Sequence, residues 1–312
     1  MVIGAGAAGM MCAIEAGKRG RSVLVVDHAK AAGEKIRISG GGRCNFTNLG
    51  TTPAAFLSEN PRFCISALSR YTPREVIALL GRHHIAWHEK TLGQLFCDDS
   101  AARIVGLLLG EMRTAGAILR LGVEASGIRK TGQGFELRVG AAAVACESLV
   151  IATGGKSIPK MGATGFGYEV AEQFGLRVTP LRPGLVPLTF ETGLLERVKP
   201  LAGLSVDVRV SCGKIRFSEA MLFTHRGISG PAILQISSYW SPGDEIVIDM
   251  APGVDVFEAL RAARKDHPRQ ALHTVLGRIL PQRLAALIAE TAGAPGNMAD
   301  ASDKVLRRAA EA

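Results

Sequence analysis

The first 27 residues contain the pattern that most restricts what this chain can fold into. Met1–Ile3 is a short apolar run that predicts a strand, and the glycine-rich turn Gly4–Gly9 follows it directly. A helical stretch then runs to about Lys18, and a second strand from Ser22 to Val26 ends in Asp27. This order of elements, with an acid closing the second strand, is typical of the βαβ unit that binds a dinucleotide. An ordinary glycine-rich strand-turn-helix is the alternative, and the acid at the expected place argues against it.

Each glycine of this turn has a physical task. Gly4 allows the tight turn, Gly6 lets the backbone approach a pyrophosphate, and Gly9 lets the helix pack closely against the strands. The start of the helix offers free N–H groups and the positive end of its dipole, and both attract phosphate. The carboxylate that ends the second strand can accept hydrogen bonds from a ribose. We therefore expect the dinucleotide to contact Gly4, Gly6, Ala7, Ala8, Gly9 and Asp27.

Composition places the chain among globular proteins. With 312 residues, of which 47% are apolar and 21% charged, it has room for two or three domains. No apolar run approaches the ~20 residues that a membrane-spanning helix needs. The six cysteines are scattered, at positions 12, 44, 64, 97, 146 and 212, and include no C-x-x-C pair. That spacing indicates free thiols in a reducing compartment, so we expect a cytoplasmic protein without a bound metal. Because no apolar run is long enough to span a bilayer, we also expect no membrane partner.

The positive charge of the chain suits an anionic cofactor. Residues 1–50 hold seven Lys and Arg against three acids, whereas the rest of the formal net charge of +9 is spread along the chain without a basic block. Aromatic residues make up only 5% of the sequence, too few to indicate a surface on which nucleic-acid bases stack. We therefore expect a small-molecule substrate and no nucleic-acid partner. The oligomeric state stays open.

A second glycine-rich segment, Gly33–Asn48, reads GEKIRISGGGRCNFTN. Its three consecutive glycines lose much backbone entropy on folding and bury nothing, which favours a loop lying against a flat or phosphorylated ligand. The segment closely resembles the signature of a family of bacterial FAD-dependent flavoproteins, the HI0933-like or YhiN/BaiN family. The resemblance implies that FAD is the cofactor and that this loop runs along it towards the isoalloxazine ring. The residues implied as contacts are Lys35, Gly41, Gly42, Arg43, Cys44 and Asn45.

Two further segments extend the resemblance. Leu149–Gly155 reads LVIATGG, a buried strand that ends in A-T-G-G and is typical of flavoproteins with two dinucleotide-binding domains. In such proteins the glycines close over the FAD, which implies contacts from Thr153, Gly154 and Gly155. Val123 and Glu124 fall where family members lean a strand backbone on the adenine, so Val123 is a further expected contact.

The segment Met221–Pro231 matches the family motif LFTHxGxSGP. It reads as a strand, a turn and the start of a helix, with Ser229 as a plausible N-cap. His225 and Arg226 are the polar residues that we expect to face a substrate. The alternative is a turn that fixes this part of the chain to the flavin domain, with no role in chemistry.

Cys44 and three histidines are weaker candidates for chemistry. Disulfide-reducing flavoproteins carry a C-x₄-C pair beside the flavin, but position 49 is Leu, so dithiol chemistry is not expected. Cys44 is either a small packing residue or a lone thiol near the flavin. His83, His84 and His88 are close in sequence, yet they straddle a predicted helix end and a predicted strand, which favours surface or packing roles over metal binding.

Local patterns predict several further elements. Thr72 and Glu75 flank Pro73 as a capping box that opens a helix, and another helix covers about 100–114. Alternating apolar residues at 206, 208 and 210 and at 215 and 217 predict a hairpin, and 244–250 predicts a strand. Helices are expected from 254 onward, the last opened by Ser302.

Together these observations predict an α/β flavoprotein. A Rossmann-like FAD-binding domain of the two-dinucleotide-binding type is expected over 1–187, carrying a β-rich and then helical substrate domain over 188–312. The expected activity is that of an FAD-dependent oxidoreductase, which transfers hydride between the flavin and a small organic substrate or NAD(P)H. Two alternatives remain: a flavin-dependent RNA-modifying enzyme and a truncated, non-catalytic flavoprotein fragment. Family members also continue beyond the position of Ala312 and return to the FAD domain, so we expect one wall of the flavin site to be missing.

Overall fold

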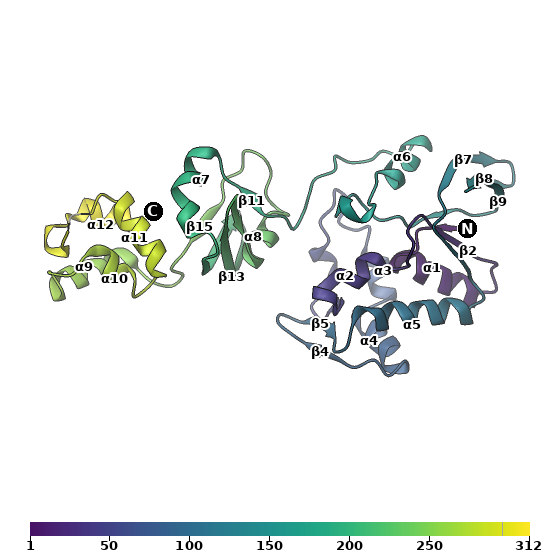
Figure 1. Cartoon of the computed structure of the whole chain (residues 1–312), viewed down its shortest axis with the longest axis horizontal. Coiled ribbons are helices and arrows are strands. Elements are labelled where there is room, and N and C mark those ends of the chain that lie inside the picture. The colour runs from purple at the N-terminus through teal and green to yellow at the C-terminus, as the bar shows by residue number, and fades with distance from the viewer. Residues whose placement is uncertain (295) are drawn as a thin grey trace. The chain divides into compact units, whose positions relative to one another are not determined.

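The computed structural model describes residues 1–294 and 296–312 and divides them into two compact units, Met1–Leu181 and Arg182–Ala312 (Figure 1). The first unit is built on a parallel sheet in the order β10-β1-β2-β6. Its strands are β1 (Val2–Ile3), β2 (Leu24–Asp27), β6 (Ile118–Leu121) and β10 (Val150–Ile151). Val2 lies opposite both Val25 and Val150, so the strand that precedes the glycine-rich turn is central.

Two helices bury an apolar stripe in the first unit. Helix α1 (Ala7–Lys18) joins β1 to β2, and α5 (Ala101–Thr114) leads into β6. The buried residues of α1 follow helical spacing: Gly9, Met10, Ala13 and Ile14. They share one core with Val2, Val25 and the buried face of α5. The predicted βαβ unit and the predicted helix over 100–114 are confirmed.

The rest of the first unit surrounds this sheet with short elements. Helix α2 (Glu34–Ile38) and the 3₁₀ turn η1 (Ser39–Gly42) lead into a three-stranded sheet of β3 (Asn45–Asn48), β5 (Gln94–Cys97) and β4 (Trp87–Glu89). The connection carries η2 (Pro53–Ala55), α3 (Ile65–Arg70) and α4 (Pro73–Arg82). A meander of β7 (Ala125–Thr131), β8 (Gly134–Val139) and β9 (Ala142–Cys146) precedes β10, and η3 (Pro159–Met161) and α6 (Phe166–Gln173) follow it. The predicted capping box of α4 is present.

The second unit pairs an antiparallel sheet with helices. The sheet order is β11-β14-β13-β12-β15. The strands are β11 (Leu188–Thr189), β12 (Ser205–Cys212), β13 (Ile215–Thr224), β14 (Gly227–Ser229) and β15 (Val247–Asp249). Burial along β12 alternates from Val206 to Val210, because every second side chain faces the core beside α8 (Pro231–Ile236). The predicted hairpin is therefore confirmed.

Helices complete the second unit as predicted from residue 254 onward. From that position onward they are α9 (Val256–Asp266), α10 (Leu272–Leu276), α11 (Gln282–Thr291), η5 (Met298–Asp300) and α12 (Asp303–Ala310). Before β12 the unit also contains α7 (Thr192–Val198) and η4 (Lys199–Leu201). The Ser302 side chain caps α12 by accepting a hydrogen bond from the Val305 N–H. Among the described residues, no helix is both long enough and apolar enough to cross a membrane.

Two local predictions for this unit are wrong. Ser229 is not an N-cap: it lies in β14, and Gly230 precedes α8 instead, with φ +94°. A side chain at Gly230 would place its Cβ 2.7 Å from the Ala220 carbonyl oxygen, so sheet packing determines the cap residue. The strand predicted over 244–250 is shortened to Val247–Asp249, because only these residues reach β12 for pairing.

Candidate cofactor site

A cleft with a volume of about 660 Å³ opens at the carboxyl ends of the parallel strands. Its wall is formed by the glycine-rich turn after β1, the loop after β2, the start of α2, the residues after β10 and the η3 region. A smaller hollow adjoins it, because Gly4, Asp27 and Thr153 line both. The crevice outside the carboxyl ends of the strands is where open α/β sheets bind their ligands.

Gly4, Gly6 and Gly9, the three glycines of the turn after β1, face different surroundings. A Cβ on Gly9 would lie 1.8 Å from the Gly4 carbonyl oxygen, so only glycine lets α1 approach β1 this closely. Gly4 has φ +109°, and its Cβ would lie 2.4 Å from the Ala152 carbonyl oxygen. Gly6 has no protein atom within 4 Å of the position of its Cβ, and it lines the cleft. The free space above Gly6 is therefore available to a ligand.

The first turn of α1 can bind an anion. Its N-cap, Gly6, makes no side-chain cap hydrogen bond, and no acidic residue lies in the first turn. Ala7 and Ala8 are exposed and line the cleft. The N–H groups that a helix start leaves unpaired, together with the positive dipole end, therefore face the cleft.

Asp27 closes the unit at the end of β2. Its Oδ2 accepts a hydrogen bond from the Ala5 N–H at 2.6 Å, and its Oδ1 accepts one from the Ala29 N–H at 2.8 Å. The His28 Nδ1 lies 3.6 Å from Oδ1. A carboxylate offers about four lone-pair sites, so two backbone bonds leave capacity for a ribose hydroxyl. Asp27 thus supports the glycine-rich turn and still lines the cleft.

Lys35 connects two segments that are far apart in the sequence. Its Nζ donates to the Gly155 carbonyl oxygen at 3.2 Å and to the Ser157 Oγ at 2.9 Å. Lys35, Thr153 and Gly154 all line the cleft, so an ammonium group stands across from the start of α1. A positive charge and a helix N-terminus that share one cleft are suited to a pyrophosphate.

The adjoining hollow offers a surface for a flat ring. Ile3, Val26, Val123 and Phe166 contribute apolar groups to it, and the hollow has a volume of about 230 Å³. The Val123 N–H donates to the Asp27 carbonyl oxygen at 3.0 Å, which holds the connection between β6 and β7 beside the end of β2. Val123 therefore lies next to the residue expected to bind a ribose.

The three glycines after α2 all adopt left-handed backbone angles, but for different reasons. A Cβ on Gly40 would lie 2.7 Å from the Phe96 ring, so Gly40 is required by packing, contrary to the interpretation that none of the three is. Gly41 has no neighbour within 4 Å of its Cβ position, and Gly42 has only the Arg37 carbonyl oxygen, at 4.0 Å. These two remain open to a ligand. The structure does not bring Gly41, Gly42, Arg43, Cys44 or Asn45 into the lining of the cleft, nor Gly9 or Gly155.

Cys44 is a buried thiol with a neighbour that its local sequence does not reveal. It is 5% exposed, has φ +55° and belongs to the main core of the first unit. Burial raises the pKa of its thiol. Cys97, fully buried in the same core, donates its N–H to the Arg43 carbonyl oxygen at 3.0 Å, and Asn45 pairs with Phe96 in the register of β3 and β5. Cys44 and Cys97 therefore lie across from each other, and both are free thiols.

His225 and Arg226 belong to the second unit, in the turn between β13 and β14. Both are exposed, the Arg226 N–H donates to the Thr224 Oγ1 at 3.3 Å, and the Arg226 carbonyl oxygen accepts from the Phe190 N–H at 3.1 Å. The backbone of this turn is thus held, while its two polar side chains remain accessible. Their role towards a substrate stays a prediction.

Two of the three histidines near α4, His83 and His88, face carboxylates. His83 Nε2 lies 2.8 Å from Glu111 Oε1, and His88 Nδ1 lies 2.6 Å from Asp98 Oδ1. Across residues 1–294 and 296–312, no three His, Cys, Asp or Glu side chains gather in a way that could hold a metal ion.

The cleft also contains residues that sequence analysis did not select. His28, Met161, Ala163 and Tyr168 line it, the first directly after Asp27 and the others around the glycine-rich segment after β10. A Cβ on Gly162 would lie 2.8 Å from the His28 Nε2, so η3 folds back onto the end of β2. The only feature of the local sequence that could have predicted His28 as a cleft residue is its position directly after Asp27. Met161, Ala163 and Tyr168 reach the cleft only because of how the segment after β10 folds.

A parallel sheet, a glycine-rich turn at a helix start and an acid ending the second strand define a Rossmann-type dinucleotide-binding protein. The chain belongs to the HI0933-like family: the family model described as the HI0933-like protein Rossmann domain matches residues 1–293. The predicted family and fold class are confirmed, as is membership in a family of FAD-dependent flavoprotein enzymes.

Three proteins of named function are similar in sequence to most of this chain. It is 52% identical over 286 residues to the ribosomal RNA dihydrouridine synthase of Escherichia coli K12, covering 91% of this chain and 71% of that protein. It is 47% identical over 294 residues to the ribosomal RNA dihydrouridine synthase of Haemophilus influenzae, covering 92% and 73%. A third relative, at 27% identity over 286 residues, is the 3-dehydro-bile acid delta(4,6)-reductase of Clostridium scindens, with 89% and 68% covered.

Solved structures resemble the chain only over part of their length. The halogenase PltM in complex with phloroglucinol and FAD shares 20% identity at a TM-score of 0.33, covering 67% of this chain and 38% of that one. The Diels-Alderase PyrE3 shares 18% identity at a TM-score of 0.39, covering 85% and 50%.

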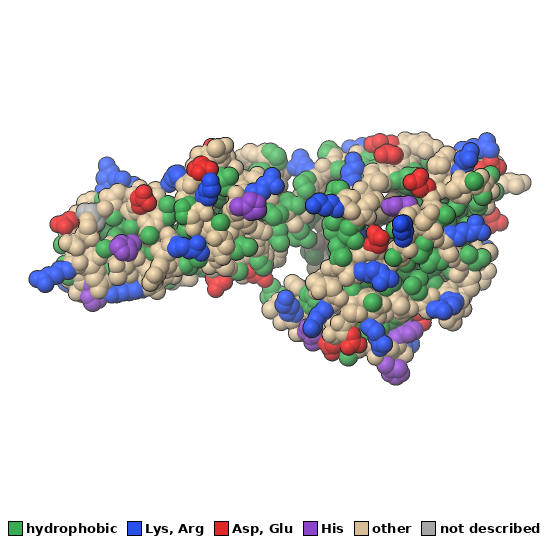
Figure 2. All heavy atoms as spheres, viewed as in Figure 1, with side chains coloured by type: hydrophobic (Ala, Val, Ile, Leu, Met, Phe, Trp, Pro, Cys, Tyr) green, Lys and Arg blue, Asp and Glu red, His purple; other side chains and the backbone are tan. Residues whose placement is uncertain are grey.

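The expectation that nucleic acid is not a partner is wrong. The relatives at 52% and 47% identity are ribosomal RNA dihydrouridine synthases, which act on RNA. The expectation relied on a low aromatic fraction and on dispersed charge, and Figure 2 indeed shows Lys and Arg side chains scattered over the viewed face. Averages over 312 residues do not reveal where the exposed aromatic rings are, and a binding surface needs only a few of them.

Proposed function

We propose that this protein is a flavin-dependent ribosomal RNA dihydrouridine synthase. In this reaction the C5–C6 double bond of a uridine base is reduced: one of these carbons receives a hydride and the other a proton. FAD supplies the hydride chemistry when it is bound, and NAD(P)H is the proposed source of the electrons. The observation that carries the proposal is the 52% identity over 91% of the chain to an enzyme of that name. An RNA substrate also agrees with the cytoplasmic location predicted from the scattered cysteines.

The residues of the cleft fit FAD. The free space above Gly6 and the unpaired N–H groups at Ala7 and Ala8 suit the pyrophosphate, with the Lys35 ammonium group opposite. Asp27 retains acceptor capacity for a ribose, and the hollow beside Val123 suits the adenine. We assign Gly41, Gly42, Arg43 and Asn45 to the part of the loop that approaches the isoalloxazine ring, because the Cβ positions of Gly41 and Gly42 are open.

We propose different roles for the two units, one in binding the cofactor and the other in binding the substrate. We assign the cofactor to the first unit, and we propose that the exposed His225 and Arg226 of the second unit contact the substrate. A second candidate function is reduction of a small organic molecule. The observation that favours it is the relative named as a bile acid reductase, which at 27% identity is weaker support.

The test uses purified protein and ribosomal RNA isolated from cells in which the gene is deleted. Heat-released cofactor is separated by chromatography, and the RNA is incubated anaerobically with protein and NADPH, digested, and analysed for dihydrouridine by mass spectrometry. FAD release and a dihydrouridine signal that is absent from the Gly6→Ala variant support the proposal. Recovery of NAD in place of FAD would overturn the cofactor assignment. Flavin reoxidation by an α,β-unsaturated ketone, without any dihydrouridine, supports the second candidate.

A further inference from the structure

The aromatic side chains that are strongly exposed come from one stretch of the chain. Among the described residues these are Phe56, Phe63, Tyr71 and Trp87, exposed by 46%, 81%, 41% and 36%. All other described Phe, Tyr and Trp side chains, in both units, are buried or half-buried. A chain with 16 aromatic residues thus places all four exposed rings between β3 and β5.

Three of these rings lie on elements too short to bury them. Phe56 follows the three-residue turn η2, Phe63 precedes α3, and Tyr71 caps the end of α3, a six-residue helix with no buried residue. The loop between them is closed, since the Cys64 Sγ donates to the Pro53 carbonyl oxygen at 3.9 Å. Leu57 and Ile65 are exposed as well, by 50% and 45%. Five exposed large apolar side chains within residues 56–71 mark this stretch as an interaction surface.

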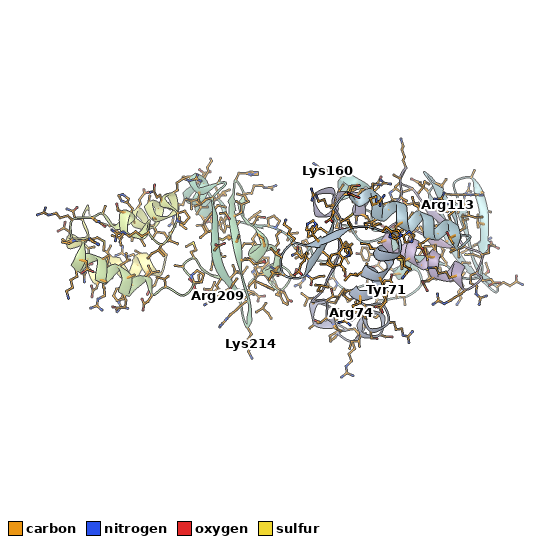
Figure 3. The ribbon with its side chains drawn as sticks, turned by 90° about the horizontal axis from the view of Figure 1, so that it is seen from below. Tyr71, Arg74, Arg113, Lys160, Arg209 and Lys214 are labelled. Carbon is orange, nitrogen blue, oxygen red and sulfur yellow. The ribbon has the colours of Figure 1, made fainter. Side chains whose placement is uncertain are left out.

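Arginines alternate with these rings along the chain. Arg62 directly precedes Phe63, Arg70 directly precedes Tyr71, and Arg74 follows within one helical turn (Tyr71 and Arg74 are labelled in Figure 3). All three arginines are exposed, and none forms an ion pair with a described residue. We call residues 54–74 the arginine–aromatic segment.

The acids near this segment are already occupied. Glu59 forms an ion pair with the Arg177 Nη2 at 2.7 Å, and Glu75 accepts a hydrogen bond from the Thr72 backbone N–H at 2.7 Å as part of the capping box. Residues 54–74 themselves hold three arginines and one acid, a net charge of +2. The segment therefore presents rings and free positive charges together, which favours a polyanion with flat groups over an uncharged protein surface.

We propose that the arginine–aromatic segment binds a single-stranded portion of the ribosomal RNA, with bases stacked on Phe56, Phe63 and Tyr71 and phosphates held by Arg62, Arg70 and Arg74. The inference rests on the proposed function, because it presumes an RNA substrate. Stacking on aromatic side chains beside arginines is how proteins hold unpaired bases, and specific recognition of RNA targets mainly such loops and single strands. Arginine adds cation–π contact to its charge, which lysine supplies less well.

The experiment measures binding of the full chain to a fluorescein-labelled, single-stranded RNA of about 20 nucleotides and mixed sequence by fluorescence anisotropy. Phe63→Ala and Tyr71→Ala are each expected to weaken binding roughly 5- to 150-fold. Phe63→Leu keeps the apolar area but removes the aromatic face, so it should bind as weakly as Phe63→Ala, whereas Phe63→Tyr should bind like wild type. Circular dichroism and bound flavin verify that each variant is folded.

Charge is tested with a matched pair. Arg74→Gln should weaken binding and lower the slope of log K against log salt by about 0.7, the value for one lost contact to a single strand. The control is Arg113→Gln, at the end of α5, where the arginine is also exposed (labelled in Figure 3) and no change is expected. Wild-type affinity in Phe63→Leu, or equal effects of Arg74→Gln and Arg113→Gln, would overturn the inference and leave the proposed function standing. If the wild-type protein neither binds RNA nor forms dihydrouridine, both the inference about this segment and the proposed function are overturned.

Discussion

The Asp27 Oδ2 accepts a hydrogen bond from the Ala5 N–H at 2.6 Å, between two residues 22 positions apart. Ala5 lies inside the glycine-rich turn, so the acid that ends β2 also holds the shape of the loop that we propose binds the pyrophosphate. The second oxygen, Oδ1, accepts from the Ala29 N–H at 2.8 Å and fixes the start of the next loop. One carboxylate thereby links the glycine-rich turn to the loop after β2.

Replacing Asp27 should therefore affect both the cofactor and the fold. Asp27→Ala removes a charged acceptor from two backbone N–H groups and from the ribose, and we expect FAD affinity to fall by on the order of 1–3 kcal/mol. Asp27→Asn keeps one oxygen acceptor and should fall between wild type and Asp27→Ala. FAD fluorescence quenching gives the Kd, with Lys30→Ala as the neighbouring control, because Lys30 is exposed and does not line the cleft. An unchanged Kd in Asp27→Ala would show that the ribose is bound elsewhere.

Two glycine substitutions should separate binding from folding. A methyl group at Gly6 meets no protein atom within 4 Å, and the backbone angles there are ordinary, so Gly6→Ala should fold normally yet lose FAD. Gly9→Ala would put its Cβ 1.8 Å from the Gly4 carbonyl oxygen, and we expect it to lower stability by about 3 kcal/mol or more. Thermal unfolding and the flavin content after gel filtration give the two readouts. Equal loss of stability in both variants would contradict this assignment of roles.

Cys44 and Cys97 should remain unreactive thiols in the folded protein. Burial raises the pKa of the Cys44 thiol, and the thiolate is the form that reacts. Iodoacetamide at about pH 8 is expected to modify the half-buried Cys64 and Cys146 much faster than Cys44 and Cys97, and all of them in urea. Peptide mass spectrometry reads the modification, and Cys44→Ser should keep most of the flavin reduction. A Cys44–Cys97 disulfide formed during turnover would instead make this pair part of the chemistry.

The contacts of Glu111 with Lys18 and His83 should give a measurable dependence of stability on pH. Hydrogen bonds from the Lys18 Nζ at 2.7 Å and from His83 lower the pKa of the Glu111 carboxyl. The pKa of Glu111 is lower in the folded than in the unfolded protein. Its contribution to folding stability is therefore fully present at pH values above the unfolded pKa of about 4.3, and it is lost as the pH falls through the folded pKa. Glu111→Gln should cost about 0.5–1 kcal/mol near neutral pH, the range for surface pairs. A melting-temperature difference from wild type that does not shrink in strong acid would argue against this pairing.

Several features of the molecule are determined by neighbours in the sequence. The capping box at Thr72 and Glu75 and the alternating strand β12 follow from spacing within about ten residues. The βαβ unit follows from a pattern contained in Met1–Asp27. The cleft follows as well, since a glycine-rich turn and an acid closing the next strand occupy the same sheet edge whenever the unit folds. These were predictable because helix periodicity, strand alternation and capping are local interactions.

Other features depend on residues that are distant in the sequence. Cys97 lies opposite Cys44 because β3 and β5 pair, and Gly40 must be glycine because the Phe96 ring approaches it. Lys35 reaches Ser157 across 122 positions. Likewise, the sequence determined how many aromatic residues there are, but only the tertiary structure decided that Phe56, Phe63 and Tyr71 stay exposed. The physical reason is that burial depends on which surfaces the packed elements offer to a side chain, and short elements such as η2 and α3 leave their rings with no surface to cover them.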